Sequence, residues 1–261
     1  MRQQPLPRTR LNAPRLVRML AAQGEIGAID ADGKASFAER ISHWIALTDA
    51  IALGRVLGTP ARPASSRTQA PVDASAALAS LQAQLERLQA TLARPEASGG
   101  GSRRSQVRMP APPSGTVGAA GVDFAPYRHF YLAQQRDMEA NVNLLRAAAR
   151  DALDGLPGAA RSLREIDGAL QAALADRERA LLAGIPHLLE RRFEALRRSA
   201  TDDAPAWMLP GGWLASFRAE LLALLEAELE LRLQPVTGLM ETLEHGMLQH
   251  AKHAMDIGHA Q

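Results

Sequence analysis

Apolar residues recur three or four positions apart along most of the chain, the spacing that places side chains on one face of an α-helix. The longest such stretch covers residues 163–198, with mixed charges between its apolar residues: Leu163, Ile166, Leu170, Leu174, Leu181, Ile185, Leu188 and Leu196. Alanine and leucine abound while aromatic residues make up 4% of the chain, a composition typical of helical proteins. We therefore predict an all-α fold.

The C-terminal half predicts an antiparallel helical bundle over residues 123–257. Its first helix should run from about residue 126 to residue 153, and the GLPG turn at 155–158 should reverse the chain into the stretch 163–198. Pro186 interrupts that stretch, because proline has no amide hydrogen and its ring crowds the preceding turn. The helix should therefore kink or restart near Pro186.

Leucines are densest in residues 213–233. Their apolar arc is too wide for a single neighbouring helix, so this segment is either the central helix of the bundle or an oligomer interface. If it is an interface, charges introduced at Leu225 and Leu229 should abolish association. Pro235 should end this helix, and a last helix should reach about Ile257.

The loop before the leucine-rich helix, residues 201–212, carries three large side chains between prolines and glycines: Trp207, Met208 and Leu209. Such side chains in a loop form either a hydrophobic plug over the core or an exposed contact site. We take these three residues as the first candidate interaction surface.

Shorter helices are predicted in the N-terminal half. A flexible basic arm covers residues 1–10, and a helical hairpin covers residues 11–58, where Ser36 and Glu39 form a capping box. Two helices of this size bury too little surface for a core of their own, so the hairpin should lean on the bundle or on another protein. A linker rich in proline and serine follows at residues 59–72.

A short heptad pattern covers residues 73–94, where leucines alternate three and four positions apart: Leu78, Leu81, Leu85, Leu88 and Leu92. A helix of this length is marginal in water without a partner. Its seam, including the candidate contact residues Leu81, Leu85 and Leu88, should pair with a second copy or pack back on the same chain. Residues 95–122 predict a disordered linker, and residues 258–261 a tail.

The net charge of +2 conceals an uneven distribution. Residues 1–122 hold fifteen Lys/Arg against eight Asp/Glu, a net +7, whereas residues 123–261 hold fifteen against twenty, a net −5. A basic front half can attract the acidic rear half, a nucleic acid or an anionic membrane. The candidates for phosphate or membrane contact are Arg8, Arg10, Arg15 and Arg18. Arginines collected in linkers would give the same balance without any ligand.

The sequence excludes several kinds of chemistry. The chain has no cysteine, so disulfides, thiolate zinc sites and cysteine nucleophiles are absent. It also has no glycine-rich phosphate or dinucleotide motif and no serine nucleophile elbow. Four histidines near the end match no zinc signature and are typical of a frayed polar terminus: His245, His250, His253 and His259. We therefore predict no enzymatic activity, no metal and no cofactor.

No apolar run approaches the roughly 20 residues of a membrane-spanning helix. The N-terminus is basic but lacks the continuous apolar core of a signal peptide. We therefore expect a soluble protein of the cytoplasm.

Three stretches of the chain carry a family resemblance. The stretches LPRTRLNAPRLVRMLAAQG and FAERISHWIALTDAIAL, with the later PYRHFYLAQQRDMEANVNLLRAAARDAL, resemble an uncharacterised proteobacterial family known only as a domain of unknown function. The resemblance covers most of the chain except the two linkers. It implies neighbouring genes for proton-channel proteins of the flagellar-stator and energy-transducer type and for peptidoglycan-binding proteins, and hence a cytoplasmic accessory of an envelope-associated complex. It implies no catalytic residues.

Three kinds of function follow from the sequence. The first is a non-enzymatic helical adaptor that binds a partner protein or a second copy through helix faces. The second is nucleic-acid binding through the basic N-terminal half, which the lack of interleaved aromatic residues disfavours. The third is attachment of the basic, amphipathic first helix to an anionic membrane surface.

Overall fold

The computed structural model describes residues 14–22, 47–58, 74–93, 107–112, 118–154, 156, 159–200 and 204–258. Its elements are α1 (Arg15–Ala22), α3 (Leu47–Gly58), α4 (Ala74–Ala93), η1 (Ala119–Gly121), α5 (Ala125–Leu153), α6 (Ala159–Leu182), α7 (Ile185–Arg198), η2 (Ala204–Met208) and α8 (Trp213–Gly258). No strand occurs among the described residues, which confirms the predicted all-α fold. The predicted arm at 1–10 and the capping box of Ser36 and Glu39 lie outside the described residues.

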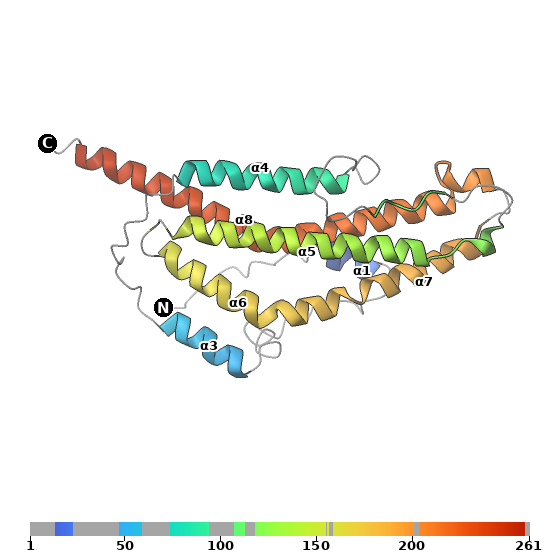
Figure 1. Cartoon of the computed structure of the whole chain (residues 1–261), viewed down its shortest axis with the longest axis horizontal. Helices are drawn as coiled ribbons and strands as arrows, with labels where there is room; N and C mark the ends of the chain where they lie inside the picture. The colour runs from blue at the N-terminus through green and yellow to red at the C-terminus, as the bar shows by residue number, and fades with distance from the viewer. Residues whose placement is uncertain are drawn as a thin grey trace, which may run out of the picture.

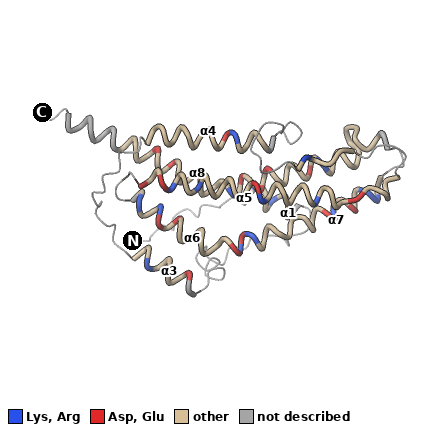
Figure 2. The backbone as a smooth tube through the Cα atoms, viewed as in Figure 1, with Lys and Arg blue, Asp and Glu red and all other residues tan. Residues whose placement is uncertain are grey.

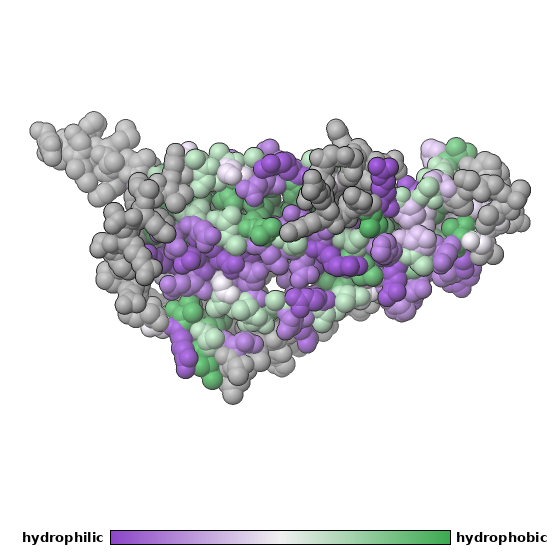
Figure 3. All heavy atoms as spheres, viewed as in Figure 1, coloured by the Kyte–Doolittle hydropathy of each residue, from purple (hydrophilic) through white to green (hydrophobic). Residues whose placement is uncertain are grey.

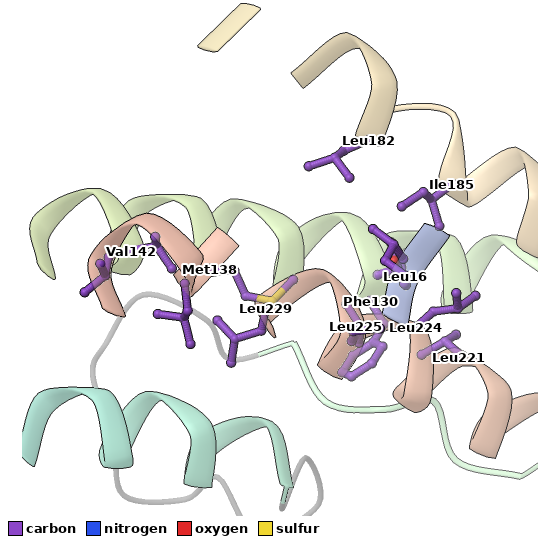
Figure 4. Close-up of a cluster of buried hydrophobic side chains, with 14 of the residues drawn as sticks. Leu16, Phe130, Met138, Val142, Leu182, Ile185, Leu221, Leu224, Leu225 and Leu229 are labelled. Carbon is purple, nitrogen blue, oxygen red and sulfur yellow. The ribbon is translucent and has the colours of Figure 1, made fainter. Parts of the chain in front are cut away.

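Helix α8 is the centre of the molecule. It contacts α1, α4, α5, α6, α7 and η2, and its longest contact is with α5 (Figure 1). Side chains around much of its circumference are buried, among them Leu221, Leu224, Leu225 and Leu229. Figure 4 shows these leucines gathered with Phe130 and Met138 of α5 and with Ile185 of α7. The wide apolar arc predicted for this segment is therefore used inside the chain, as that of a central helix.

Helices α6 and α7 are two helices separated by a two-residue turn. Helix α6 ends at Leu182 and α7 begins at Ile185 after Ala183 and Gly184. Pro186 lies in the first turn of α7, where an amide hydrogen has no partner within the helix. The helix predicted to kink or restart near Pro186 therefore restarts. Figure 1 shows α6 and α7 running in the opposite direction to α5 and α8.

The prediction that Pro235 ends its helix is wrong, because α8 continues through Pro235 to Gly258. A proline inside a helix removes one backbone hydrogen bond and costs about 3 kcal/mol. Buried apolar side chains lie on both sides of it, with Leu233 at 5%, Val236 at 0% and Leu239 at 2% exposure. Packing against the bundle on both sides of the proline offsets the lost hydrogen bond.

The heptad helix packs back on its own chain. Helix α4 lies along α5 and α8, with Leu78 and Leu81 buried and Leu85 and Leu88 half-buried against the core. Because the bundle of the same chain occupies this face, self-association of α4, which stays a prediction, would have to use its other faces.

The end of the predicted linker 95–122 is packed on the bundle. Met109 and Val122 belong to the core, at 7% and 6% exposure. Two arginines hold the backbone there: Arg218 of α8 donates to the carbonyl of Pro110, and Arg197 of α7 donates to the carbonyl of Val122 at 2.9 Å. Residues 107–112 and 118–122 therefore cover the end of the bundle where α5 begins.

The two described helices of the predicted hairpin contact different parts of the bundle. Helix α1 packs on α8 and buries Leu16 and Leu20, whereas α3 packs on α6 (Figure 1). The apolar side of α1 is therefore used against the core.

Candidate docking site

The candidate residues Trp207, Met208 and Leu209 lie where the chain turns from η2 into α8. Trp207 is 2% exposed and its ring lies 5.8 Å from that of Trp213, edge to face. Met208 and Leu209 point outward, with 38% and 59% of their surface exposed. Trp207 is therefore buried as a hydrophobic plug, whereas Met208 and Leu209 are exposed, and their role as a contact site stays a prediction.

Two glycines fix the shape of this turn. Gly211 has φ of +86°, a conformation that favours glycine. A Cβ on Gly212 would lie 2.3 Å from the carbonyl oxygens of Ala206 and Trp207, which no side chain tolerates. Two backbone hydrogen bonds close the turn, from Leu209 to Ala206 at 3.2 Å and from Gly212 to Leu209 at 2.8 Å. We call residues 208–210 the docking turn.

The docking turn is apolar and uncharged. No Lys, Arg, Asp or Glu occurs between residues 204 and 217, whereas both signs of charge are interspersed along α5, α6 and α7 (Figure 2). Hydrophobic side chains reach the surface at this end of the molecule and again at α3 (Figure 3). A small apolar protrusion on a polar surface is typical of a protein contact site.

Replacing Gly212 by alanine should distort the docking turn and lower the free energy of unfolding by roughly 1–3 kcal/mol, because the new Cβ overlaps two carbonyl groups. Denaturant unfolding followed by tryptophan fluorescence would measure both the loss and the exposure of Trp207. Gly238→Ala is the matched control. It lies within α8 with nothing within 4 Å of the new Cβ, so it should stabilise by up to about 1 kcal/mol. Equal stability of the two variants would contradict this account.

An aromatic cluster inside the bundle supports the docking turn. The Phe193 ring is completely buried and lies 5.0 Å from that of Phe217 and 5.3 Å from that of Trp213. Phe124 and Tyr127 of the α5 end complete the cluster, at 5.5 Å and 5.8 Å from Phe193. These edge-to-face and tilted contacts connect α5 and α7 to Trp213 of α8, the residue against which Trp207 packs.

A second group of polar side chains lies inside the bundle around Glu228, which has no exposed surface. Its carboxylate accepts hydrogen bonds from the Tyr131 hydroxyl and from Gln135 Nε2, both at 2.9 Å, and from the Arg232 guanidinium at 2.9 Å. Arg232 also pairs with Glu178 of α6 at 3.2 Å. Burial, and then the adjacent carboxylate, raise the pKa of Tyr131 well above its usual value, so its hydroxyl remains a donor. We call these five residues the Glu228 hub.

The Glu228 hub was missed from the sequence, although a signal exists. Glu228 is four residues after Leu224 and seven after Leu221, so helical spacing places it on the buried face with these leucines. A carboxylate at an inward position requires partners, since an unpaired buried charge is very costly. The sequence does not say which residues of other helices supply them.

The remaining candidate contact residues lie inside the chain. Leu225 and Leu229 are buried at 1% and 4% exposure, and Leu81 at 2%. Leu85 and Leu88 are half-buried against the core. A charge at Leu225 or Leu229 would therefore disrupt folding before it could report on association.

The candidate cationic residues are not gathered into one site among the described residues. Arg15 pairs with Glu230 at 2.9 Å and Glu226 at 3.7 Å on α8, so it binds the acidic half of its own chain. Arg18 is exposed, and Arg8 and Arg10 lie outside the described residues.

Neither a metal-ligand cluster nor a membrane-spanning helix occurs in the part of the chain that the structure describes. No three His, Asp or Glu residues there come together as a metal site. Nε2 of His245 lies 2.9 Å from the amide of Gln249 one turn later, and His259 is outside the described residues. None of the described helices has the length and apolar character to cross a membrane.

The described residues thus define an all-α protein in which the other helices surround the central helix α8. The apolar docking turn comes directly before α8, at one end of the molecule. Residues 1–245 match the family described as "Protein of unknown function (DUF3348)", and the chain belongs to that family. The predicted resemblance to a domain of unknown function is confirmed to this extent. No curated protein and no solved structure matches the chain.

Proposed function

We propose that this protein is a non-enzymatic helical interaction protein that binds a partner protein through the docking turn. The observation that carries the proposal is the exposure of Met208 and Leu209 on a turn held rigid by buried Trp207 and by the two glycines. A preorganised apolar contact loses little conformational entropy on binding, so its burial contributes to affinity.

The partner surface should contain an apolar pocket with a polar rim. Two side chains alone cannot supply the roughly 800 Å² per partner of a stable interface. The same end of the bundle carries the start of α5 and the end of α7, where Arg128, His129 and Arg198 are exposed (Figure 1). These polar groups would surround the apolar centre, the usual arrangement of a protein interface.

The internal polar groups support a non-catalytic role. The carboxylates of Glu228 and Asp167 are buried, and each is bound by arginines of the same chain. They join helices to one another and lie away from the exposed docking turn. We accordingly assign the Glu228 hub to structure and the docking turn to function.

The proposal is tested by replacing the exposed side chains. Full-length tagged protein carrying Met208→Glu and Leu209→Glu should recover its partner from the native host at least about tenfold less well, since a loss of about 1.4 kcal/mol is tenfold in affinity. Leu144→Glu is the matched control, because Leu144 is 60% exposed on α5, away from the turn. Equal recovery by both variants, measured by quantitative mass spectrometry, would sink the proposal.

The kind of complex and the cellular location that we propose rest on the family resemblance. We infer a cytoplasmic accessory of an envelope-associated complex, so the recovered partner should belong to such a complex. Nucleic-acid binding and membrane-surface attachment through the basic N-terminal half are the alternatives. A salt-dependent mobility shift would support the first, and flotation with anionic vesicles that is lost on removing residues 1–23 would support the second.

A further inference from the structure

Helix α6 is packed differently from the rest of the bundle. Of its described side chains only Ala160, Asp167 and Leu182 are buried, and the residues of its predicted apolar stripe between Leu163 and Leu174 are half-buried. The short helix α7 that follows buries four apolar residues: Ile185, Pro186, Leu189 and Phe193. The chain therefore passes from a weakly buried helix to a firmly buried one across the turn at Ala183 and Gly184.

A group of polar side chains joins α6 to α5. Asp167 accepts from Arg146 at 2.9 Å and from Arg150 at 3.4 Å. One turn on, Gln171 accepts from Arg150 at 2.7 Å and donates to Asn143 at 2.9 Å. We call these five residues the polar seam.

Two further contacts continue the seam toward the end of α6. Arg179 pairs with Glu139 at 3.3 Å, and Glu178 pairs with Arg232 of α8 at 3.2 Å. At the last residue of α6, the carbonyl of Leu182 accepts from Gln135 of the Glu228 hub at 3.2 Å. Through this hydrogen bond, the Glu228 hub binds the end of α6 beside the turn where α7 begins.

Among the described residues, α6 contacts α3 as well as α5 and α8. Leu53 and Val56 of α3 are half-buried, while Ile51 and Leu57 are 50% and 62% exposed. An open cleft of about 500 Å³ lies between α3, α5 and α6, with Val56, Ala147 and Gly168 in its walls. Helix α3 reaches the bundle through α6 (Figure 1).

We propose that α3 and α6 form one cooperative unit that detaches from the bundle while α5, α7 and α8 stay folded. Water can replace the polar contacts of the seam, whereas it cannot replace the apolar contacts of α5 with α8, so the unit opens at a lower free energy than the whole protein. Opening uncovers the seam arginines of α5. It leaves the docking turn at the far end intact, so the opened form of α3 and α6 does not depend on the proposed function.

The experiment is hydrogen exchange with mass spectrometry on the full chain. Peptides of α3 and α6 should exchange together and at least about tenfold faster than those of α5 and α8, as expected for a sub-global opening. Raising the salt concentration should accelerate the α3 and α6 peptides, because it screens the exposed pair of Arg179 and Glu139 near the end of α6. Exchange of α6 at the rate of the α5 and α8 core would overturn the proposal.

A matched pair of variants tests the role of the seam. Asp167→Asn should accelerate exchange in α3 and α6 about tenfold or more and leave α7 and α8 unchanged. Glu220→Gln is the control, because Glu220 pairs with Arg192 between α7 and α8 at 2.6 Å and lies outside the unit. Equal acceleration of every helix by Asp167→Asn, or none in α6, would show that the seam does not hold this unit. If that variant does not fold, the salt series on the unmodified chain decides.

Discussion

Replacing Glu228 by alanine should lower the free energy of unfolding by about 3–5 kcal/mol, the usual cost of removing one partner from a buried ion pair. The carboxylate has no exposed surface and accepts hydrogen bonds from three side chains. Its loss leaves the Arg232 charge buried with Glu178 alone and leaves the Tyr131 hydroxyl without an acceptor. Chemical denaturation followed by circular dichroism would measure the change.

Two comparisons separate charge from packing at this position. Replacing both Glu228 and Arg232 by leucine removes the ion pair as a whole, so the double variant should recover most of the stability lost in Glu228→Ala. Tyr131→Phe removes one hydrogen bond to the carboxylate and should cost about 1 kcal/mol. A loss below about 1 kcal/mol for Glu228→Ala would mean that the hub contributes little to folding.

The helical periodicity of the sequence predicts most of the fold. Spacings of three and four residues predict α5 and α4 within a residue or two of their ends, and Pro186 predicts the restart at α7. The same proline rule fails at Pro235, because it considers only the backbone of the helix and not the packing of its side chains. Buried contacts at Val236 and Leu239 decide the outcome there, and such contacts depend on neighbours that are distant in the sequence.

The candidate site was predicted in part. Three large side chains in a loop rich in glycine and proline predict either a buried plug or an exposed contact site. They do not indicate which of the three residues is buried and which are exposed. Trp207 is buried against Trp213, which packs on Phe193, and the cluster around Phe193 includes rings from the start of α5, which is distant in sequence. The apolar stripe of α6 likewise predicts a partner helix without identifying α3. Pairing between helices is the information that a single amphipathic pattern lacks.

Replacing Phe193 by alanine should lower the free energy of unfolding by about 3–5 kcal/mol and loosen the docking turn, because the ring lies at the centre of the aromatic cluster. It is completely buried, contacts four other rings, and has the Arg197 guanidinium 5.8 Å from its centroid. The cavity would remove the support of Trp213, which in turn packs against Trp207. Denaturation should therefore show lower stability, and acrylamide should quench tryptophan fluorescence more strongly in the native state.

The control separates this effect from a general loss of apolar surface. Leu144→Ala removes an apolar side chain that is 60% exposed, so its stability should stay within about 0.5 kcal/mol of the unmodified protein. If Phe193→Ala lost stability without any rise in quenching, the aromatic cluster would support the bundle but not the docking turn. Since the proposed function depends on a rigid turn, partner recovery by Phe193→Ala at a temperature where it remains folded should fall together with the protection of Trp207.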